Sequence, residues 1–223
     1  MKEFLRSCAD IPYNSASADL PDAYNDHRTW GLDCVGFAKL VVEAYPDFQM
    51  ISGLYGTESV HMAAIAPSNR SDHLYYVDAF LRMKEPLPVR RDVFTEVETH
   101  FEGFVISGKY DSANNMLYIA LQQRDRCHSK YTFRLGTPLM PPTPHRYRYS
   151  VLHEGRPVTV EKQKRVGGTT SVAVKGAEET VETVLQQKIG IGIQDVALMF
   201  FYAEENSRYN RFQMEAPVTI STA

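Results

Sequence analysis

One stretch decides the fold: Trp30-Gly31-Leu32-Asp33-Cys34-Val35-Gly36-Phe37-Ala38-Lys39-Leu40. It places a cysteine between a glycine-containing turn and an apolar run that is long enough for a buried helix. Cys34 should therefore lie at the N-terminus of a helix that ends before Pro46. The free N–H groups and partial positive charge of such a terminus favour a thiolate and would hold a developing oxyanion. The stretch thus predicts a cysteine nucleophile.

A cysteine nucleophile needs a base, and two strand-like segments further along supply a candidate base and its partner. His61 begins the segment 61–65, and Asp78 ends the segment 74–78. If these segments pair as antiparallel strands, the Asp78 carboxylate can orient the His61 imidazole, and the imidazole can take the thiol proton. Taken singly, the residues fit a buried cysteine, a core histidine and a strand-end cap. Their combination favours a catalytic triad of Cys34, His61 and Asp78.

Composition excludes several other classes of protein. The chain has 223 residues, of which 43% are hydrophobic, so it can bury a sizeable core. A formal net charge of -3 gives no reason to expect nucleic acid or an anionic membrane as a partner. No apolar run is long enough to span a membrane, and the charged start of the chain does not resemble a signal peptide. We expect a soluble, cytoplasmic protein; nothing in the sequence predicts its oligomeric state.

The cysteines and histidines do not predict a metal site or a disulfide framework. Cys8, Cys34 and Cys127 are odd in number and lack the spacing of metal ligands. His73 and His128 have no second ligand at helical spacing, so we expect polar surface histidines there. One reactive thiol fits this pattern better.

In chain order, the pattern predicts an α+β protein in three regions. Residues 1–50 should form a helical lobe that carries the nucleophile, and residues 51–146 an antiparallel β-barrel that carries the histidine and the aspartate. The proline-rich segment 136–144 reads as an extended linker, and residues 147–223 should form an α/β lid.

Individual elements follow from the same patterns. A helix is expected over residues 2–9, and another around Val181, Val184, Leu185 and Ile189. A hairpin should turn at Glu154-Gly155. The remaining segments are expected to be strands: 103–106, 116–121, 131–135, 170–174, 196–202 and 212–220.

With these residues in place, the sequence resembles a short, divergent arylamine N-acetyltransferase, a family with a transglutaminase-like fold. The matching positions are Ile11-Pro12-Tyr13-Asn14, Gly31, Cys34, His61, Tyr76-Val77-Asp78-Ala79-Phe80, Glu85-Pro86-Leu87-Pro88, Glu154-Gly155-Arg156, Glu182-Thr183-Val184-Leu185 and Lys188-Ile189-Gly190-Ile191. The resemblance implies a helical lobe, a barrel and an α/β lid. It also implies an enzyme that transfers an acetyl or other short acyl group from acyl-CoA to an aromatic amine through an acyl-cysteine. Acyl-CoA would be a co-substrate rather than a bound cofactor.

The cysteine motif departs from the family pattern. Trp30, Gly31 and Leu32 stand where the family has Arg-Gly-Gly ahead of the residue that precedes the cysteine. Val35 and Gly36 replace the aromatic and acidic residues that follow the family's cysteine. These changes keep two alternatives open. One is a transglutaminase-like thiol amidase, peptidase or amide synthase that uses the triad without CoA, and the other is a scaffold without catalytic activity. Trp30, Phe37, Tyr76 and Phe80 are the aromatic residues that could receive a flat acceptor, or equally belong to the core.

Overall fold

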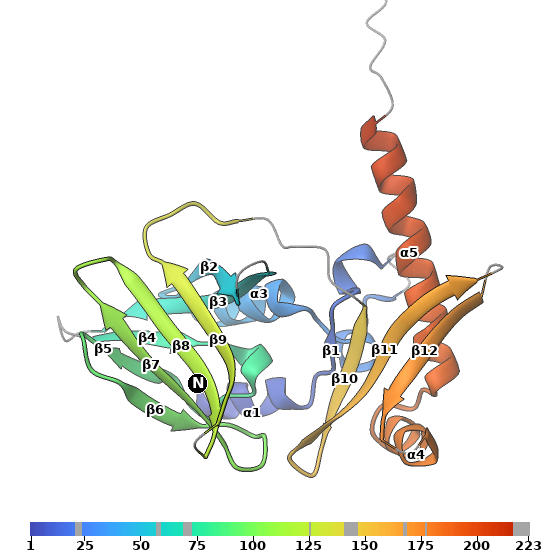
Figure 1. Cartoon of the computed structure of the whole chain (residues 1–223), viewed down its shortest axis with the longest axis horizontal. Helices are drawn as coiled ribbons and strands as arrows, with labels where there is room; N and C mark the ends of the chain where they lie inside the picture. The colour runs from blue at the N-terminus through green and yellow to red at the C-terminus, as the bar shows by residue number, and fades with distance from the viewer. Residues whose placement is uncertain are drawn as a thin grey trace, which may run out of the picture.

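The structure is a computed structural model, and it describes residues 1–20, 24–56, 59–68, 73–124, 126–140, 147–166, 169–176 and 178–215. Its architecture is α+β, as the sequence predicts: helices at the N-terminus, an eight-stranded antiparallel sheet, and a second sheet covered by helices. Figure 1 shows the eight-stranded sheet on one side of the molecule and the helix-covered sheet on the other.

The larger sheet curls into a nearly closed barrel. Its strand order is β5-β4-β3-β2-β9-β8-β7-β6, and every neighbouring pair is antiparallel. The end strand β5 lies against β6 and β7 at the opposite end of the sheet, which brings the two edges together. The strands are β2 (Gln49–Tyr55), β3 (Ser59–Pro67), β4 (His73–Val77), β5 (Leu87–Arg90), β6 (Thr95–Glu98), β7 (Phe104–Asp111), β8 (Met116–Gln123) and β9 (Arg126–Arg134).

Two N-terminal helices pack onto this barrel. Helix α1 (Lys2–Ala9) and helix α3 (Cys34–Ala44) have the bounds expected from their apolar spacing. Leu5 from α1 and Phe37 from α3 join the same buried cluster as Phe133 from β9. Helix α3 also contacts β3 and the short helix η3 (Ala79–Leu81). The core of the barrel therefore continues directly into the helical lobe, and α3 is held against the strand that carries His61.

The smaller sheet forms the lid, in the order β1-β10-β11-β12. The strands are β1 (Tyr13–Asn14), β10 (Arg148–His153), β11 (Arg156–Val166) and β12 (Thr169–Lys175). Strands β10 and β11 join at Glu154 and Gly155, both with positive φ, which confirms the predicted hairpin. Helices α4 (Glu178–Ile189) and α5 (Ile193–Glu215) cover one face of this sheet, and their apolar side chains form a second buried cluster with Tyr149 and Val160.

The closing segment corrects one expectation. Residues 196–202 are not a strand but part of helix α5, which also includes residues 212–215; the rest of the predicted strand 212–220 lies outside the described residues. Val196, Met199, Phe200 and Ala203 are fully buried at helical spacing, whereas Leu198 is about half exposed. A continuous apolar run fits a strand or a helix, and packing against the lid sheet favours the helix here.

The structure also contains strands that the patterns did not predict. β1, β2, β5 and β6 were not expected as strands, and three of them have four residues or fewer. Such short edge elements have too few residues for a period-two pattern to stand out. The division into lobes at residues 50 and 146 stays a prediction.

Candidate active site

Cys34 is the first residue of helix α3, the position that its sequence context predicts. The helix is capped by Asp33, whose Oδ1 accepts a hydrogen bond of 2.8 Å from the Gly36 N–H. The Cys34 side chain is 9% exposed and lines a cavity, so the thiol is sheltered but reachable. The start of the helix thus presents one thiol to one cavity.

The turn before Cys34 is held by the segment 11–14, which includes β1. The Leu32 N–H donates to the Pro12 carbonyl at 3.0 Å, and the Asn14 N–H donates to the Leu32 carbonyl at 2.9 Å. Gly31 has φ of +79°, and a Cβ there would lie 2.5 Å from the Pro12 oxygen. Only glycine fits this close approach of two backbones. The position of Cys34 therefore depends on β1 as well as on its own helix.

His61 and Asp78 come together from adjacent antiparallel strands, as the sequence predicts. Strands β3 and β4 pair with Ala64 opposite Val77, which leaves Asp78 just beyond the end of β4 and near His61. His61 Nε2 and Asp78 Oδ2 are 2.5 Å apart, and both side chains are almost fully buried. Asp78 is also the N-cap of η3, so the catalytic and capping interpretations of this residue describe one geometry.

Tyr76 adds a second donor to the same carboxylate. Its hydroxyl donates to Asp78 Oδ2 at 2.9 Å, and the ring is fully buried. The contact with Asp78 raises the pKa of Tyr76, although burial raises it more, so the hydroxyl keeps its proton and acts as a donor. With Nε2 and Tyr76 both on Oδ2, the orientation of the carboxylate is fixed from two sides.

The electrostatic balance at His61 favours the imidazolium. Burial by itself lowers the pKa of His61, but the Asp78 carboxylate and a hydrogen bond and charge interaction with Cys34 raise it to about 10. Because Asp78 occupies Nε2, the ring nitrogen left for Cys34 is Nδ1. Cys34 and the Asp78 carboxylate therefore lie at different nitrogens of the imidazole ring.

Aromatic side chains enclose the imidazole. The rings of Tyr131 and Phe80 lie 4.6 Å and 5.3 Å from it, centroid to centroid. Phe133 lies beneath, and it has room because its neighbour on β2 is Gly53, where a Cβ would come within 2.4 Å of the Phe133 ring. The packing restricts rotation of His61 and keeps water from the His61–Asp78 pair.

The cavity beside Cys34 and His61 has a volume of about 310 Å³. Aromatic rings and small hydroxyl side chains make up most of its wall. Its lining residues are Tyr13, Ser15, Cys34, Tyr55, Ser59, Val60, His61, Phe80, Ser129, Tyr131 and Arg148. They come from the helical lobe, the barrel and the lid, so the cavity lies where the three regions meet.

Sequence patterns identified the polar centre of this site but not most of its walls. Of the four aromatic residues considered for an acceptor, Phe80 lines the cavity, whereas Phe37 and Tyr76 belong to the core and Trp30 packs in the lid cluster. Among the lining residues that the sequence did not point to are Tyr13, Tyr55, Tyr131 and Arg148. Tyr13 could have been found from the sequence, because it lies in the segment used for the family resemblance. The others are brought to the site by strand pairing that a single sequence does not reveal.

The other cysteines and His73 lie in different surroundings. Cys8 is buried in the core, and burial raises its pKa to about 11. Cys127 is exposed on β9. The Nε2 atom of His73 accepts a hydrogen bond from Arg90 at 2.9 Å, between strands β4 and β5. Neither Cys8, Cys127 nor His73 lines the cavity.

Two kinds of feature are absent from the described part of the chain. No three histidine, cysteine or acidic side chains there are grouped so that they could hold a metal ion. No helix there is long and apolar enough to cross a membrane.

By architecture, the protein falls in the class in which a cysteine-bearing helix packs on an antiparallel barrel beside an α/β lid. Solved structures that match it include several arylamine N-acetyltransferases. That from Mycobacterium marinum in complex with CoA is 16% identical, with a TM-score of 0.55, over 92% of this chain and 91% of the other. The M. smegmatis structure is 16% identical, with a TM-score of 0.54, over 91% and 90%. The Salmonella typhimurium structure is 16% identical, with a TM-score of 0.51, over 94% and 89%.

Sequence comparison alone does not detect this likeness. No protein-family model matches the chain, and no curated protein sequence is detectably similar to it. The structural matches, in contrast, show that the chain has the fold of the arylamine N-acetyltransferases over nearly its whole length.

Proposed function

We propose that this protein is a cysteine-dependent acyltransferase. It moves an acetyl or other short acyl group from acyl-CoA to an aromatic amine-type acceptor. The observation that carries the proposal is the buried set of Cys34, His61 and Asp78, of which Cys34 and His61 line one cavity. The fold of the arylamine N-acetyltransferases, one of them solved with CoA, supports acyl-CoA as the donor.

The first half of the reaction forms an acyl-cysteine. The Cys34 thiolate attacks the thioester carbonyl. N–H groups at the start of α3, other than the Gly36 N–H that donates to Asp33, stabilise the oxyanion, a contribution typically worth about 3 to 4 kcal/mol. The C–S bond to CoA then breaks, and the CoA sulfur takes the proton held by the His61 imidazolium. The products of this half are acyl-Cys34, CoA thiol and a neutral imidazole.

The same geometry prepares His61 for the second half. The negative charge on Cys34 is one of the causes that raise the pKa of His61. Acylation removes that charge, so the pKa of His61 falls and the neutral imidazole can accept a proton from the attacking amine. The amine nitrogen bonds to the acyl carbon, the Cys34 thiolate leaves, and the thiolate–imidazolium pair is restored. Asp78 keeps one tautomer and one ring orientation throughout.

The acceptor should be flat and of modest size. Tyr13 and Phe80 pack together at 4.6 Å between ring centroids, and Tyr55 stacks on Tyr131 at 5.2 Å. All four rings line the cavity of about 310 Å³, which is near the lower end of the size range of small-molecule sites. Such a space suits a single aromatic ring with an amine.

The test is intact-protein and peptide mass spectrometry after mixing with acetyl-CoA. We expect one acetyl group on Cys34, none on Cys8 or Cys127, and loss of that group when an aromatic amine is added. A Cys34→Ser variant controls for chemical acetylation elsewhere. Labelling of Cys34 by iodoacetamide without acetylation would favour the thiol amidase, peptidase or amide synthase, and labelling by neither reagent would favour the inactive scaffold.

A further inference from the structure

One charged side chain stands out at the cavity. Among the described residues that line it, Arg148 is the only one with a permanent charge. It is the first residue of β10, at the lid side of the site, and its side chain is 50% exposed. Neither the triad nor the acyl transfer described above uses it. A guanidinium beside a reaction centre is a common binding group for an anion.

Arg148 is held in place from two directions. Its N–H donates to the Ser15 hydroxyl at 2.8 Å, and the Ser15 N–H donates to its carbonyl at 3.0 Å. Its Nη2 pairs with Glu161 Oε1 at 2.7 Å. That ion pair engages one terminal nitrogen, whereas a guanidinium carries five N–H donors. The group is thus oriented in advance while donors remain for a further acceptor.

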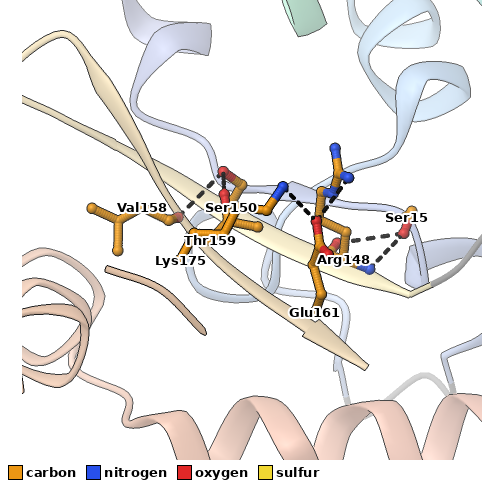
Figure 2. Close-up of polar contacts among 7 residues, drawn as sticks. All are labelled: Ser15, Arg148, Ser150, Val158, Thr159, Glu161 and Lys175. Carbon is orange, nitrogen blue, oxygen red and sulfur yellow. Dashed lines mark hydrogen bonds and ion pairs between the residues drawn. The ribbon is translucent and has the colours of Figure 1, made fainter. Parts of the chain in front are cut away.

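Arg148 heads a row of polar residues that we call the polar strip: Arg148, Ser150, Thr159, Glu161 and Lys175. In Figure 2 the Arg148 and Lys175 side chains converge on the Glu161 carboxylate, and the Ser150 and Thr159 hydroxyls meet beside them. Arg148 is opposite Glu161, Ser150 opposite Thr159, and Thr159 opposite Lys175, so the five side chains share one face of the sheet. The alternate residues Tyr149 and Val160 face helices α4 and α5.

The polar strip carries excess positive charge. Two cations share a single carboxylate, with Lys175 Nζ 3.0 Å from the same Glu161 oxygen as Arg148. Burial raises the pKa of Glu161, but its bonds to Lys175 and its attraction to Arg148 lower it overall, so the carboxylate is ionised near neutral pH. The sum of the three charges is about +1, and Arg148, at one end of the strip, lines the cavity.

We propose that Arg148 binds an anionic group of a substrate, a carboxylate or a phosphate, while the reacting atom lies at Cys34. The proposal rests on the proposed function and specifies its substrates: either the acyl donor, through a CoA phosphate, or the acceptor, through a carboxylate on its ring. Guanidinium–oxyanion pairing is short, directional and often bidentate, which suits a group fixed as Arg148 is. The aromatic walls would hold the ring and Arg148 would set which end of the substrate faces the lid.

Equilibrium binding tests this without relying on turnover. Calorimetry compares two pairs of ligands: CoA with pantetheine, which lacks the nucleotide together with its phosphates, and 4-aminobenzoate with the neutral 4-aminobenzamide. The variants are Arg148→Gln and, as a matched control, Arg156→Gln. Arg156 lies on the same sheet and pairs with Glu102, its side chain is 78% exposed, and it is not among the cavity-lining residues.

We expect Arg148→Gln to weaken binding of CoA, of 4-aminobenzoate or of both by about fivefold or more, the range of a charge-assisted bond reduced for partial exposure. The neutral partner of the affected ligand should change by less than about twofold, and Arg156→Gln should leave all four ligands unchanged. The anionic ligand that responds identifies the source of the anion.

Four results would overturn the anion site. They are an equal effect of Arg148→Gln on anionic and neutral ligands, no effect on any ligand, the same effect from Arg156→Gln, or no binding of either anionic ligand to the parent protein. Acetylation of Cys34 by acetyl-CoA is scored separately in the parent. Absent acetylation refutes the proposed function, whereas intact acetylation together with unselective binding refutes only the role of Arg148.

Discussion

Replacing Asp78 by Asn should separate capture of the substrate from reaction with it. Asp78 touches His61 Nε2 at 2.5 Å but does not line the cavity, so the substitution leaves the binding surface unchanged. Asparagine caps helices as well as aspartate does, so η3 should persist. The variant should fold, bind ligands with near-normal affinity, and lose reactivity at Cys34.

The size of the loss follows from the pair itself. Burial lowers the pKa of His61, and the charge and hydrogen bond of Asp78, which act more strongly than those of Cys34, contribute most to offsetting that cost. Without the carboxylate the imidazolium loses its strongest partner. We therefore expect acylation or alkylation to slow by at least about a hundredfold, the low end of what general-base catalysis contributes. In a comparable triad, loss of the carboxylate lowers the reaction rate by about four orders of magnitude.

The assay is stopped-flow alkylation of Cys34 by iodoacetamide across pH. In Asp78→Asn, we expect slower alkylation near neutrality and a profile displaced to higher pH, because the imidazolium that stabilises the thiolate has lost its partner. Asp47→Asn, an exposed aspartate just beyond α3, is the control for loss of one carboxylate. A circular dichroism melt checks the fold. If the Asp78→Asn profile overlays that of the parent, Asp78 is only a cap and the site is a Cys–His pair.

Three further outcomes test the same geometry. His61→Ala should reduce Cys34 alkylation as far as Asp78→Asn does or further, whereas His73→Ala should leave it unchanged; the reverse result would move the base to His73. The pKa of His61 is raised in the folded state, so its contribution to the free energy of unfolding is full below about pH 6.5 and lost by about pH 10. Urea unfolding of the parent should therefore show stability falling between those pH values. The fall should be smaller in Asp78→Asn. Tyr76→Phe should slow alkylation by about two- to tenfold through loss of one donor to Asp78, and it should also alter the pH profile; a change in melting temperature alone would assign Tyr76 to packing.

Local sequence patterns were sufficient to predict those parts of the site that depend on local structure. The helix start at Cys34 can be predicted from a short window, because a glycine-containing turn precedes it and the apolar run behind it is long enough for a buried helix. The pairing of the His61 and Asp78 segments follows from two strands separated by a short connection. Both features depend on neighbours in the sequence, so a single sequence can reveal them.

Tertiary packing determined the rest. In the run 196–202 every residue is apolar, which leaves helix and strand equally compatible, and the choice is made by burial of Met199 and Phe200 on the lid sheet. Arg148 has no distinguishing context in the sequence. It reaches the cavity because β10 pairs with β1. Arg148 contacts Ser15, the residue after β1, across a separation of 133 residues. Contacts at that separation leave no periodic signal.

The two-residue strand β1 explains how such distant parts make one cavity. The backbone of Tyr13 pairs with Ser150 of the lid on one side and forms a bridge to Leu32, in the turn before Cys34, on the other. Its ring packs on Phe80, two residues after Asp78. Backbone bonds, which are less variable than side-chain contacts, therefore fix the lid sheet relative to the nucleophile. A substrate anchored at the polar strip would have its reacting end set at a defined distance from Cys34, which is what efficient attack on a carbonyl requires.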